Sequence, residues 1–282
     1  MTDQPDVLYD VQDRIATITL NRPERLNAYN AHMAQSIKLE MAKAASDPDV
    51  RVIVLTGAGR GFCAGADMEV LSSDSAAGQA TSRTVDTDLD RKFESALGPD
   101  LSPHFKDSQR FAYFARTKKP IIAAINGPAA GIGLVMALYA DMRFAAEKAV
   151  FTTSFAQRGL VAEHGISWLL PRLVGQAHAL DLLMSARKIS AEEAQRIGLV
   201  NRIFAQDNFM DNVRAYARHM ADTVSPRSMA VMKAQVWKSN FQDFNESLAT
   251  ADAEMKTSLA GPEFKEGVAH FLEKRIPRFA DI

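Results

Sequence analysis

The sequence predicts a mixed α/β fold. Apolar, β-branched runs typical of strands occur at residues 15–20, 50–55 and 121–125. Apolar residues with helical spacing lie between the first two runs, and helical patterns dominate the chain after residue 207. With 282 residues and 47% hydrophobic content, the chain can bury a substantial core, as one large domain or as a domain with an appendage.

The first elements have clear local signals. The alternating run Ile15–Leu20 ends at the turn-forming sequence Asn21-Arg22-Pro23, so we expect a strand that enters a turn. A helix follows, because Asn30 is a good N-cap. Its apolar stripe recurs every fourth residue at Met33, Ile37, Met41 and Ala45. Asp47-Pro48 ends this helix, since proline disfavours helical backbone at the residue before it, and the next strand spans Val50–Leu55.

Two glycine-bounded segments carry the strongest functional signal. Residues 61–67 (Gly-Phe-Cys-Ala-Gly-Ala-Asp) follow the strand-like run 52–57, and residues 126–133 (Asn-Gly-Pro-Ala-Ala-Gly-Ile-Gly) follow the run 121–125. Both place backbone N–H groups at strand ends, where no side chain blocks a ligand. Residues 131–139 have helical composition, so the first N–H groups of that helix favour a negative charge. A pair of convergent N–H donors is what an enolate or a tetrahedral oxyanion needs.

The chain resembles the crotonase (enoyl-CoA hydratase/isomerase) superfamily over nearly its whole length. The family-like stretches besides the glycine segments are 21–28, 169–175, 194–200 and 273–279. The resemblance implies a crotonase-like spiral of strand-strand-helix units over residues 1–206. A helical C-terminal region, residues 207–282, is then expected to make subunit contacts and to complete the substrate site. The resemblance also implies a coenzyme A thioester whose oxygen is held by the N–H groups of Ala66 and Ile132.

The resemblance does not fix the reaction, because enzymes on one fold change chemistry by changing side chains. Typical enoyl-CoA hydratases carry two glutamates that orient and activate water, and the matching positions here are Val135 and Phe155. Neither side chain can transfer a proton. A substitute is Glu163, whose position is similar to that of the acidic residue in dienoyl-CoA isomerases and in the ring-epoxide isomerases of phenylacetate breakdown. One carboxylate suffices for a double-bond shift, so Glu163 favours proton shuttling over water addition.

Each candidate also has a structural interpretation. Glu163 can instead cap the following helix or pair with an arginine such as Arg158. His164 can donate to the substrate or tune Glu163, or it can be only a surface or capping residue. Asp67 suits a structural helix cap better than a catalytic role. Cys63 is interpreted as packing rather than as a nucleophile.

Further contacts with the substrate follow from the resemblance. Arg25 lies beside a turn that the family uses for the pantetheine and nucleotide, and Lys274 lies in the C-terminal region. Both are expected to contact phosphate, with an ordinary solvated charge as the alternative. Backbone at Ala28 and Ala64 is expected to line the ligand.

The acyl group is expected to lie against apolar side chains. Val135 and Phe155 line the substrate site in this interpretation, and the polar region 72–119, punctuated by glycine and proline, is expected to cover it as a mobile segment. A long covering region and an aromatic residue in place of a glutamate allow a larger, more apolar acyl group than a short linear chain.

Composition excludes several other classes. The formal charge of −1, from 33 basic and 34 acidic residues, provides no positive electrostatic field that would attract nucleic acid or anionic membranes. The N-terminus lacks a secretory layout and no apolar run is long enough to span a bilayer, which predicts a soluble cytoplasmic protein. The glycine clusters lack phosphate-loop and dinucleotide spacing, and the histidines lack metal-ligand spacing. No metal or permanently bound cofactor is therefore expected, and coenzyme A enters as part of the substrate.

The leading hypothesis is an acyl-CoA enzyme that stabilises a thioester enolate at Ala66 and Ile132 while Glu163 moves a proton, most simply as an enoyl-CoA isomerase. Two alternatives stay open. One is a hydratase that adds water to a 2-enoyl-CoA with one carboxylate, and the other is a non-catalytic acyl-CoA binder. A homotrimer or homohexamer is expected from the resemblance. The C-terminal residues expected to supply its apolar contact surface are Val213, Met220, Met229 and Met232.

Overall fold

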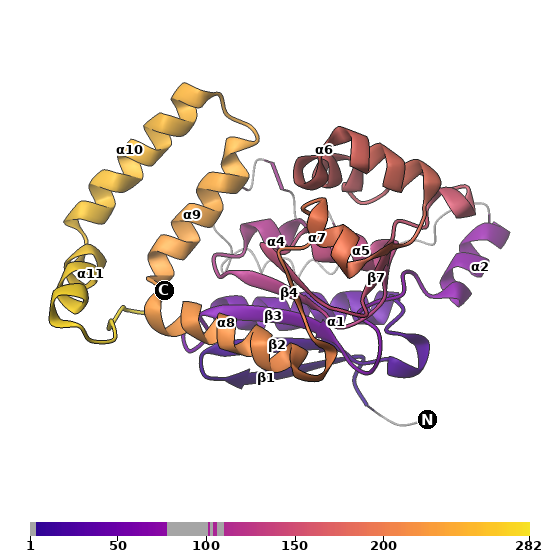
Figure 1. The fold of residues 1–282 in the computed structure, drawn as a ribbon, viewed down its shortest axis with the longest axis horizontal. Helices are drawn as coiled ribbons and strands as arrows, with labels where there is room; N and C mark the ends of the chain where they lie inside the picture. Colours follow the sequence, from indigo (N-terminus) through magenta and orange to yellow (C-terminus); the bar gives the residue numbers. More distant parts are fainter. Residues whose placement is uncertain (1–3, 78–100, 102–103, 106–109) are drawn as a thin grey trace.

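A six-stranded sheet forms the centre of the protein (Figure 1). The computed structural model describes residues 4–77, 101, 104–105 and 110–282. The strand order is β1-β2-β3-β4-β6-β9, with β1 antiparallel to β2 and all later neighbours parallel. The strands are β1 (Val7–Gln12), β2 (Ile15–Leu20), β3 (Val52–Gly57), β4 (Ile121–Ile125), β6 (Met142–Ala146) and β9 (Arg202–Phe204).

A small second sheet stands beside the first. It consists of β5 (Ala129–Ala130), β7 (Val150–Thr152) and β8 (Ile189–Ser190), in the order β5-β7-β8. β5 runs parallel to β7, and β7 runs antiparallel to β8. Because β5 lies inside the second glycine segment, this sheet holds that segment in place.

Helices cover both faces of the large sheet, because alternate side chains of a strand point to opposite faces. On one face Ile53 and Leu55 of β3 join a core with α1 (Ala31–Ser46), α4 (Ala112–Arg116), α5 (Ile132–Leu138) and α6 (Ile166–Ser185). On the other face Val52 and Val54 pack with α8 (Phe209–Thr223). The strands β3 and β4 are buried along their whole length, as expected for parallel strands covered on both sides.

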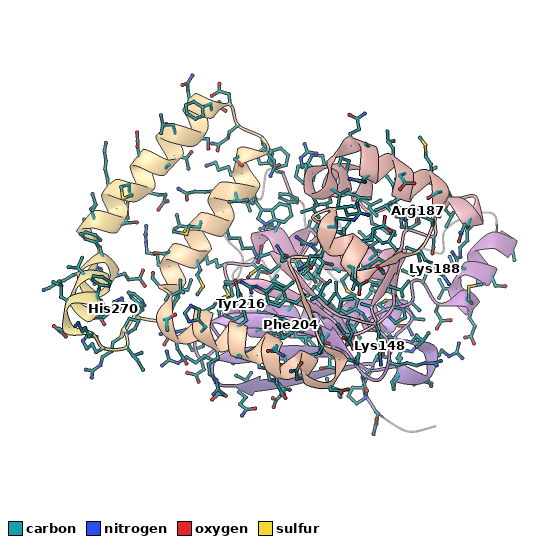
Figure 2. The ribbon with its side chains drawn as sticks, in the orientation of Figure 1. Lys148, Arg187, Lys188, Phe204, Tyr216 and His270 are labelled. Atoms are coloured by element: carbon teal, nitrogen blue, oxygen red, sulfur yellow. The ribbon has the colours of Figure 1, made fainter. Side chains whose placement is uncertain are left out.

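Aromatic side chains fix α8 on its face of the sheet. Phe144 of β6 makes edge-on contacts with Phe204 of β9 and Tyr216 of α8, with ring centroids 5.7 and 4.9 Å apart. Figure 2 labels Phe204 and Tyr216 beside α8. Edge-to-face geometry suits the opposite charges of ring edge and ring face.

The elements predicted from local signals are confirmed, although β3 spans Val52–Gly57 and so begins and ends two residues later than the predicted Val50–Leu55. β2 spans the predicted residues, and α1 starts after Asn30, whose side chain accepts a hydrogen bond from the Met33 N–H at 2.7 Å. The stripe residues Met33, Ile37 and Met41 are buried. The helix ends at Ser46, before Asp47-Pro48.

The remaining helices are α2 (Met68–Ala77), α7 (Ala191–Arg196), α9 (Pro226–Ser239), α10 (Phe244–Ala260) and α11 (Pro262–Glu273). Short 3₁₀ turns are η1 (Pro23–Arg25), η3 (Ala156–Arg158) and η4 (Gln206–Asn208). α6 bends at Gly175, which has φ +77°. Within the part of the chain that the structure describes, no helix is long and apolar enough to cross a membrane.

The C-terminal region divides into two parts. The boundary predicted at residues 206 and 207 lies in η4. The following helix, α8, packs on the sheet, and α9 packs against α4, whereas α10 and α11 lie away from the sheet on the left of Figure 1. The predicted contact residues Val213 and Met229 are buried within the chain, so expecting them on a subunit surface was wrong, whereas Met232 is exposed.

The region predicted to cover the substrate is described only in part. Its described parts include most of α2 and all of α4, and residues 78–100, 102–103 and 106–109 of this prediction lie outside the described residues. Leu101 and Phe105 are buried against Trp168 of α6 and Trp237 of α9. The covering role stays a prediction.

Candidate active site

The first glycine segment turns one backbone N–H outward. The Tyr29 N–H donates to the Gly65 carbonyl at 2.7 Å, and the Asp67 N–H donates to the Tyr29 carbonyl at 2.9 Å. In this parallel pairing, Gly65 and Asp67 both bond to Tyr29, so the residue between them directs its own N–H away from Tyr29. That residue is Ala66. Its N–H has no hydrogen-bond partner among the described residues.

The second segment supplies a similar donor at the start of α5. The Gly131 N–H donates to the Thr152 carbonyl at 3.1 Å, and the Val135 N–H donates to the Gly131 carbonyl at 3.0 Å. Ile132 is the first residue of α5, and the first N–H groups of a helix have no acceptor within it. The Ile132 N–H has no partner within the described ranges.

The two segments are neighbours in space. The Cys63 N–H donates to the Pro128 carbonyl at 3.1 Å, and the Ala130 N–H donates to the Cys63 carbonyl at 3.0 Å. A Cβ placed on Gly131 would lie 4.0 Å from the Cα of Gly65. The glycines directly before the two donors are therefore neighbours, and Ala66 and Ile132 lie on adjacent segments.

Close packing of α5 on the first segment requires glycine at position 133. A Cβ there would lie 2.4 Å from the carbonyl oxygen of Cys63 and 2.8 Å from its Sγ. Cys63 itself is fully buried, and burial raises the pKa of its thiol to about 11. A thiol that stays protonated at neutral pH is a poor nucleophile, which supports the packing interpretation.

The acidic candidate Glu163 lies in the loop between η3 and α6. Its side chain is 38% exposed, and its Oε2 lies 3.5 Å from Nε2 of His164, whose side chain is 12% exposed. The N-cap of α6 is Gly165, with no side-chain cap. Arg158 donates instead to the carbonyl of Ser154 at 3.0 Å. Neither structural alternative for Glu163, a helix cap or a pair with Arg158, describes this geometry.

A tyrosine that sequence reasoning missed connects this loop to α5. The hydroxyl of Tyr139, at the end of α5, donates to the His164 carbonyl at 3.0 Å. The contact spans 25 residues of sequence, so no local pattern signals it.

Apolar residues occupy the positions where typical hydratases carry glutamates. Val135 on α5 is 0% exposed and Phe155 is 6% exposed. Both belong to the apolar cluster that contains Ile132. The surroundings of the second donor therefore offer packing and no proton transfer at these two positions.

Asp67 has a structural setting. It is buried, accepts a hydrogen bond from the Glu69 N–H at 3.2 Å, and directly precedes α2, as expected of a helix cap. Arg22 donates to Asp67 at 2.8 Å and to the Ala28 carbonyl at 2.6 Å. Burial opposes ionisation of Asp67, but the hydrogen bonds from Arg22 and Glu69 outweigh it and lower the pKa of the carboxyl. Arg22 thus fixes the first segment, a role that the sequence analysis missed.

The predicted coenzyme A residues fall into two places. Ala28 and Ala64 lie on adjoining backbone, since the Ala64 N–H donates to the Leu26 carbonyl at 3.0 Å. Arg25 lies beside them, 45% exposed, with Nη1 2.9 Å from a Glu69 carboxylate oxygen. Lys274 directly follows α11, which Figure 1 shows at the opposite end of the molecule from α2. One chain does not bring Lys274 to the Ala66 segment.

Comparison with known proteins points to one family. The family model described as Enoyl-CoA hydratase/isomerase matches residues 10–97 and 87–282. The chain is 32% identical over 278 residues to 1,2-epoxyphenylacetyl-CoA isomerase of Escherichia coli, covering 97% of both chains. It is 37% identical over 270 residues to the Mycobacterium tuberculosis protein named "Probable enoyl-CoA hydratase EchA12", covering 95% of this chain and 90% of that one.

Solved structures give the same result for the fold. An enoyl-CoA hydratase from Polaromonas superposes with a TM-score of 0.81 at 27% identity, covering 97% of this chain and 99% of that one. A probable enoyl-CoA hydratase/isomerase from Mycobacterium abscessus gives a TM-score of 0.82 at 29% identity, covering 98% and 99%. The predicted crotonase-like α/β fold is confirmed.

Proposed function

The chain belongs to the enoyl-CoA hydratase/isomerase family, and from that premise we propose that it isomerises a double bond in an acyl-CoA thioester. The observation that carries the proposal is the pair of backbone N–H groups at Ala66 and Ile132, which have no partner among the described residues and lie on adjacent glycine segments. Such a pair stabilises negative charge on a thioester oxygen more strongly as the enolate forms.

Glu163 moves the proton in this proposal. Its carboxylate removes a proton from the carbon next to the thioester carbonyl of a 3-enoyl-CoA, and the electron pair delocalises onto the oxygen held by Ala66 and Ile132. The carboxylic acid then returns the proton to the carbon two positions further along, which gives the 2-enoyl-CoA. Atoms and charge balance without water. His164, within 3.5 Å of the carboxylate, assists by orienting it.

The acyl group that the site favours is apolar and bulky. Val135 and Phe155 extend the apolar cluster around Ile132 where water-activating carboxylates would otherwise stand. The relative that isomerises 1,2-epoxyphenylacetyl-CoA supports a ring-bearing acyl chain as one substrate class. Arg25, with backbone of Ala28 and Ala64, is proposed to contact the coenzyme A portion.

Hydration is the second candidate, because several relatives are named enoyl-CoA hydratases. A single carboxylate would then activate water for addition to a 2-enoyl-CoA. The third possibility is a binder of acyl-CoA without activity, which the apolar Val135 and Phe155 favour and Glu163 opposes.

Product mass separates these candidates. The protein would be incubated with crotonyl-CoA, 3-hexenoyl-CoA and 1,2-epoxyphenylacetyl-CoA, and the products followed by mass spectrometry. Double-bond isomerisation predicts a new chromatographic peak of unchanged mass from 3-hexenoyl-CoA. A peak of unchanged mass from 1,2-epoxyphenylacetyl-CoA alone would indicate instead the reaction in the name of the Escherichia coli relative. A product heavier by one water from crotonyl-CoA would favour the hydratase. Tight binding without product from any substrate would favour the non-catalytic alternative.

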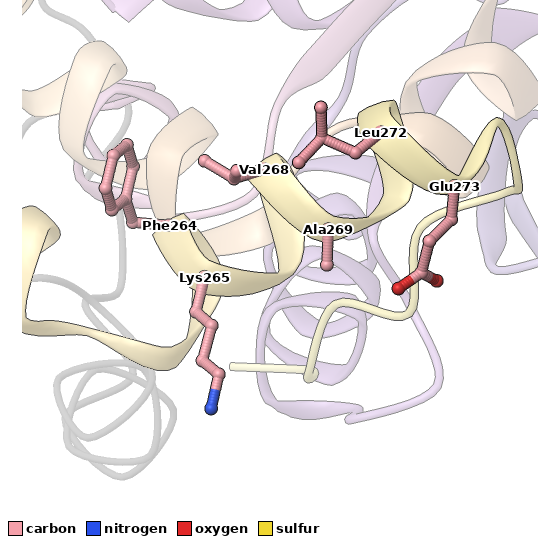
Figure 3. A pocket seen from close by; sticks show the side chains of 6 residues that line it. All are labelled: Phe264, Lys265, Val268, Ala269, Leu272 and Glu273. Carbon is pink, nitrogen blue, oxygen red and sulfur yellow. The ribbon is translucent and has the colours of Figure 1, made fainter.

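We also propose a homotrimer or a pair of trimers. The described C-terminal helices leave large apolar side chains exposed, such as Phe244 on α10 and Phe271 and Leu272 on α11, at 79%, 77% and 73%. Figure 3 shows a shallow hollow on α11 lined by Phe264, Lys265, Val268, Ala269, Leu272 and Glu273. Apolar surface of this kind supports subunit contact. Lys274 at the end of α11 would then reach a neighbouring subunit's ligand.

A further inference from the structure

Tyr139 connects the helix that begins with the donor Ile132 to the loop that carries Glu163. It directly follows α5, the helix whose first residue is the donor Ile132. Its hydroxyl donates at 3.0 Å to the carbonyl of His164, the residue next to Glu163. One short helix therefore carries an N–H donor at its start and anchors the carboxylate's loop at its end.

The loop that carries Glu163 has an unusual backbone. His164 and Gly165 are both in the left-handed region, with φ +56° and +82°. A histidine in this region is strained relative to ordinary backbone and persists only where the surroundings hold it. The Ile166 N–H donates to the Glu163 carbonyl at 3.1 Å, and the Tyr139 hydroxyl donates to the His164 carbonyl. These two hydrogen bonds hold the turn.

Gly165 makes room for the tyrosine hydroxyl. A Cβ on Gly165 would lie 2.7 Å from the Tyr139 oxygen, closer than nonbonded atoms approach. Glycine is thus required here both by the positive φ and by the hydroxyl. The fit between Tyr139 and the turn is specific to the polar end of the ring.

The rest of the tyrosine ring is anchored independently of the hydroxyl. Tyr139 is 8% exposed and packs at a tilt against Phe111, with ring centroids 6.0 Å apart. Burial raises the pKa of the phenol, so it stays protonated and remains a donor at neutral pH. Removing the oxygen alone should leave the packing of α5 intact.

From these contacts we infer that Tyr139 is a positioning residue, which holds the turn at His164 so that the Glu163 carboxylate meets the acyl chain in the geometry needed for proton transfer. The inference rests on the proposed role of Glu163. A carboxylate that is misplaced by about 1 Å can lose on the order of 100-fold in rate, although the substrate still binds.

The decisive variant is Tyr139→Phe, with Tyr9→Phe as its matched control. The Tyr9 hydroxyl is also buried, on β1, and has no hydrogen-bond partner among the described residues. Both variants lose one buried hydroxyl, and only one of them loses a bond to the catalytic loop. With the acyl-CoA of the three-substrate panel that wild type converts fastest, Tyr139→Phe should lower kcat by about 10- to 100-fold with KM unchanged. Tyr9→Phe should match wild type.

A double variant separates positioning from an independent effect. If Tyr139 acts through Glu163, Glu163→Gln with Tyr139→Phe should be no slower than Glu163→Gln alone, because the hydroxyl then has nothing left to position. Multiplicative losses would overturn the inference and leave the role of Glu163 standing. A kcat for Tyr139→Phe equal to that for Tyr9→Phe would also overturn the inference about Tyr139 and leave the proposed role of Glu163 unaffected.

Hydrogen exchange tests the inference without any turnover. The amides of residues 163–168 should exchange faster in Tyr139→Phe than in Tyr9→Phe, because the turn loses an anchor. Gly165→Ala, which pushes on the hydroxyl, should show the same faster exchange. Equal exchange in all variants overturns the inference. Full turnover by Glu163→Gln, by contrast, removes the proposed role of Glu163 and the inference that depends on it.

Discussion

Lys119 illustrates how a single buried residue sets a property of the whole protein. It is 3% exposed, and its ammonium group donates to the carbonyl of Ala44 at 2.9 Å and to that of Asp47, both at the end of α1. Carbonyls at a helix end favour a cation. Burial nevertheless lowers the pKa of Lys119 to about 8, against the opposing pull of the Asp47 and Asp281 carboxylates.

This pKa predicts a rise in stability with pH. Between pH 8 and 10.5, the ordinary value of lysine, the unfolded chain binds more protons at this position than the folded chain, so the free energy of unfolding increases with pH. From pH 7 to 9 the gain is about 1 kcal/mol. Lys119→Met lacks the titrating group and should lose this gain.

Urea unfolding followed by tryptophan fluorescence at pH 7 and pH 9 measures the gain in both proteins. Burial also raises the pKa of Cys63 to about 11, which lowers stability as pH rises from about 9. That contribution is common to wild type and variant, so it cancels in the comparison. The same pH dependence in both proteins would show that Lys119 does not titrate as described.

Residues whose partners are local were predictable, and those whose partners are distant were not. Asn30 bonds three residues ahead and Asp67 two residues ahead, so a cap can be inferred from spacing alone. Lys119 bonds across 75 residues to Ala44, and Tyr139 bonds across 25 to His164. Only the fold brings such partners together.

At the scale of elements, the approach of α5 to the first glycine segment decides the site. Gly133 lets the helix lie directly on Cys63, and this contact holds the Ile132 N–H near Ala66. The sequence indicated both segments, because glycines at strand ends are a local signal, and the resemblance to the crotonase superfamily assigned the donors within them to Ala66 and Ile132. It did not indicate β5, β7 and β8, since strands of two or three residues have no measurable periodicity.

Gly133→Ala should therefore damage both stability and activity. The added Cβ would lie 2.4 Å from a backbone oxygen, so α5 must shift, and overpacking of this kind costs about 1–3 kcal/mol. Gly267→Ala on α11 is the control, because a Cβ there meets no described atom within 4 Å and alanine favours a helix. Thermal unfolding and turnover of both variants measure the difference. Wild-type stability in Gly133→Ala would contradict the close approach.

At the scale of the whole molecule, the C-terminal helices leave the sheet and the chain then returns to it. Arg51, at the start of β3, donates to the Phe279 carbonyl at 2.6 Å and to the Ala221 carbonyl at 2.9 Å. It also pairs with Asp281 at 2.5 Å. This buried arginine ties the end of the chain to the sheet, so α9–α11 are anchored at both ends.

The exposed apolar side chains of the C-terminal helices predict that copies of the chain associate. Light scattering should give a mass three or six times that of the 30.9 kDa chain. Phe271→Glu on α11 should weaken the assembly, whereas Met184→Glu on α6, an apolar residue of similar exposure, serves as the control. A stable wild-type monomer at micromolar concentration would contradict the proposed assembly and the role of Lys274 at a neighbouring site.

The order of motifs along the chain predicted the fold through the resemblance to the crotonase superfamily, whereas periodicity alone predicted only a mixture of strands and helices. The exposed faces of the C-terminal helices were harder to predict. Val213 and Met232 are both apolar residues within helical patterns, yet Val213 packs on the sheet and Met232 is exposed. Helical periodicity identifies an apolar face but not which surface covers it.

The central claim is that Glu163 transfers the proton while Ala66 and Ile132 hold the thioester oxygen. The most direct test is deuterium incorporation from D₂O at the acyl α and γ carbons, compared among wild type, Glu163→Gln and His164→Ala, with acyl-CoA binding measured in parallel. Glutamine keeps the size of glutamate but cannot take and return a proton, so exchange should fall by about 10²–10⁴-fold in Glu163→Gln, with binding retained and a smaller loss in His164→Ala. Exchange at the wild-type rate in Glu163→Gln would contradict the claim.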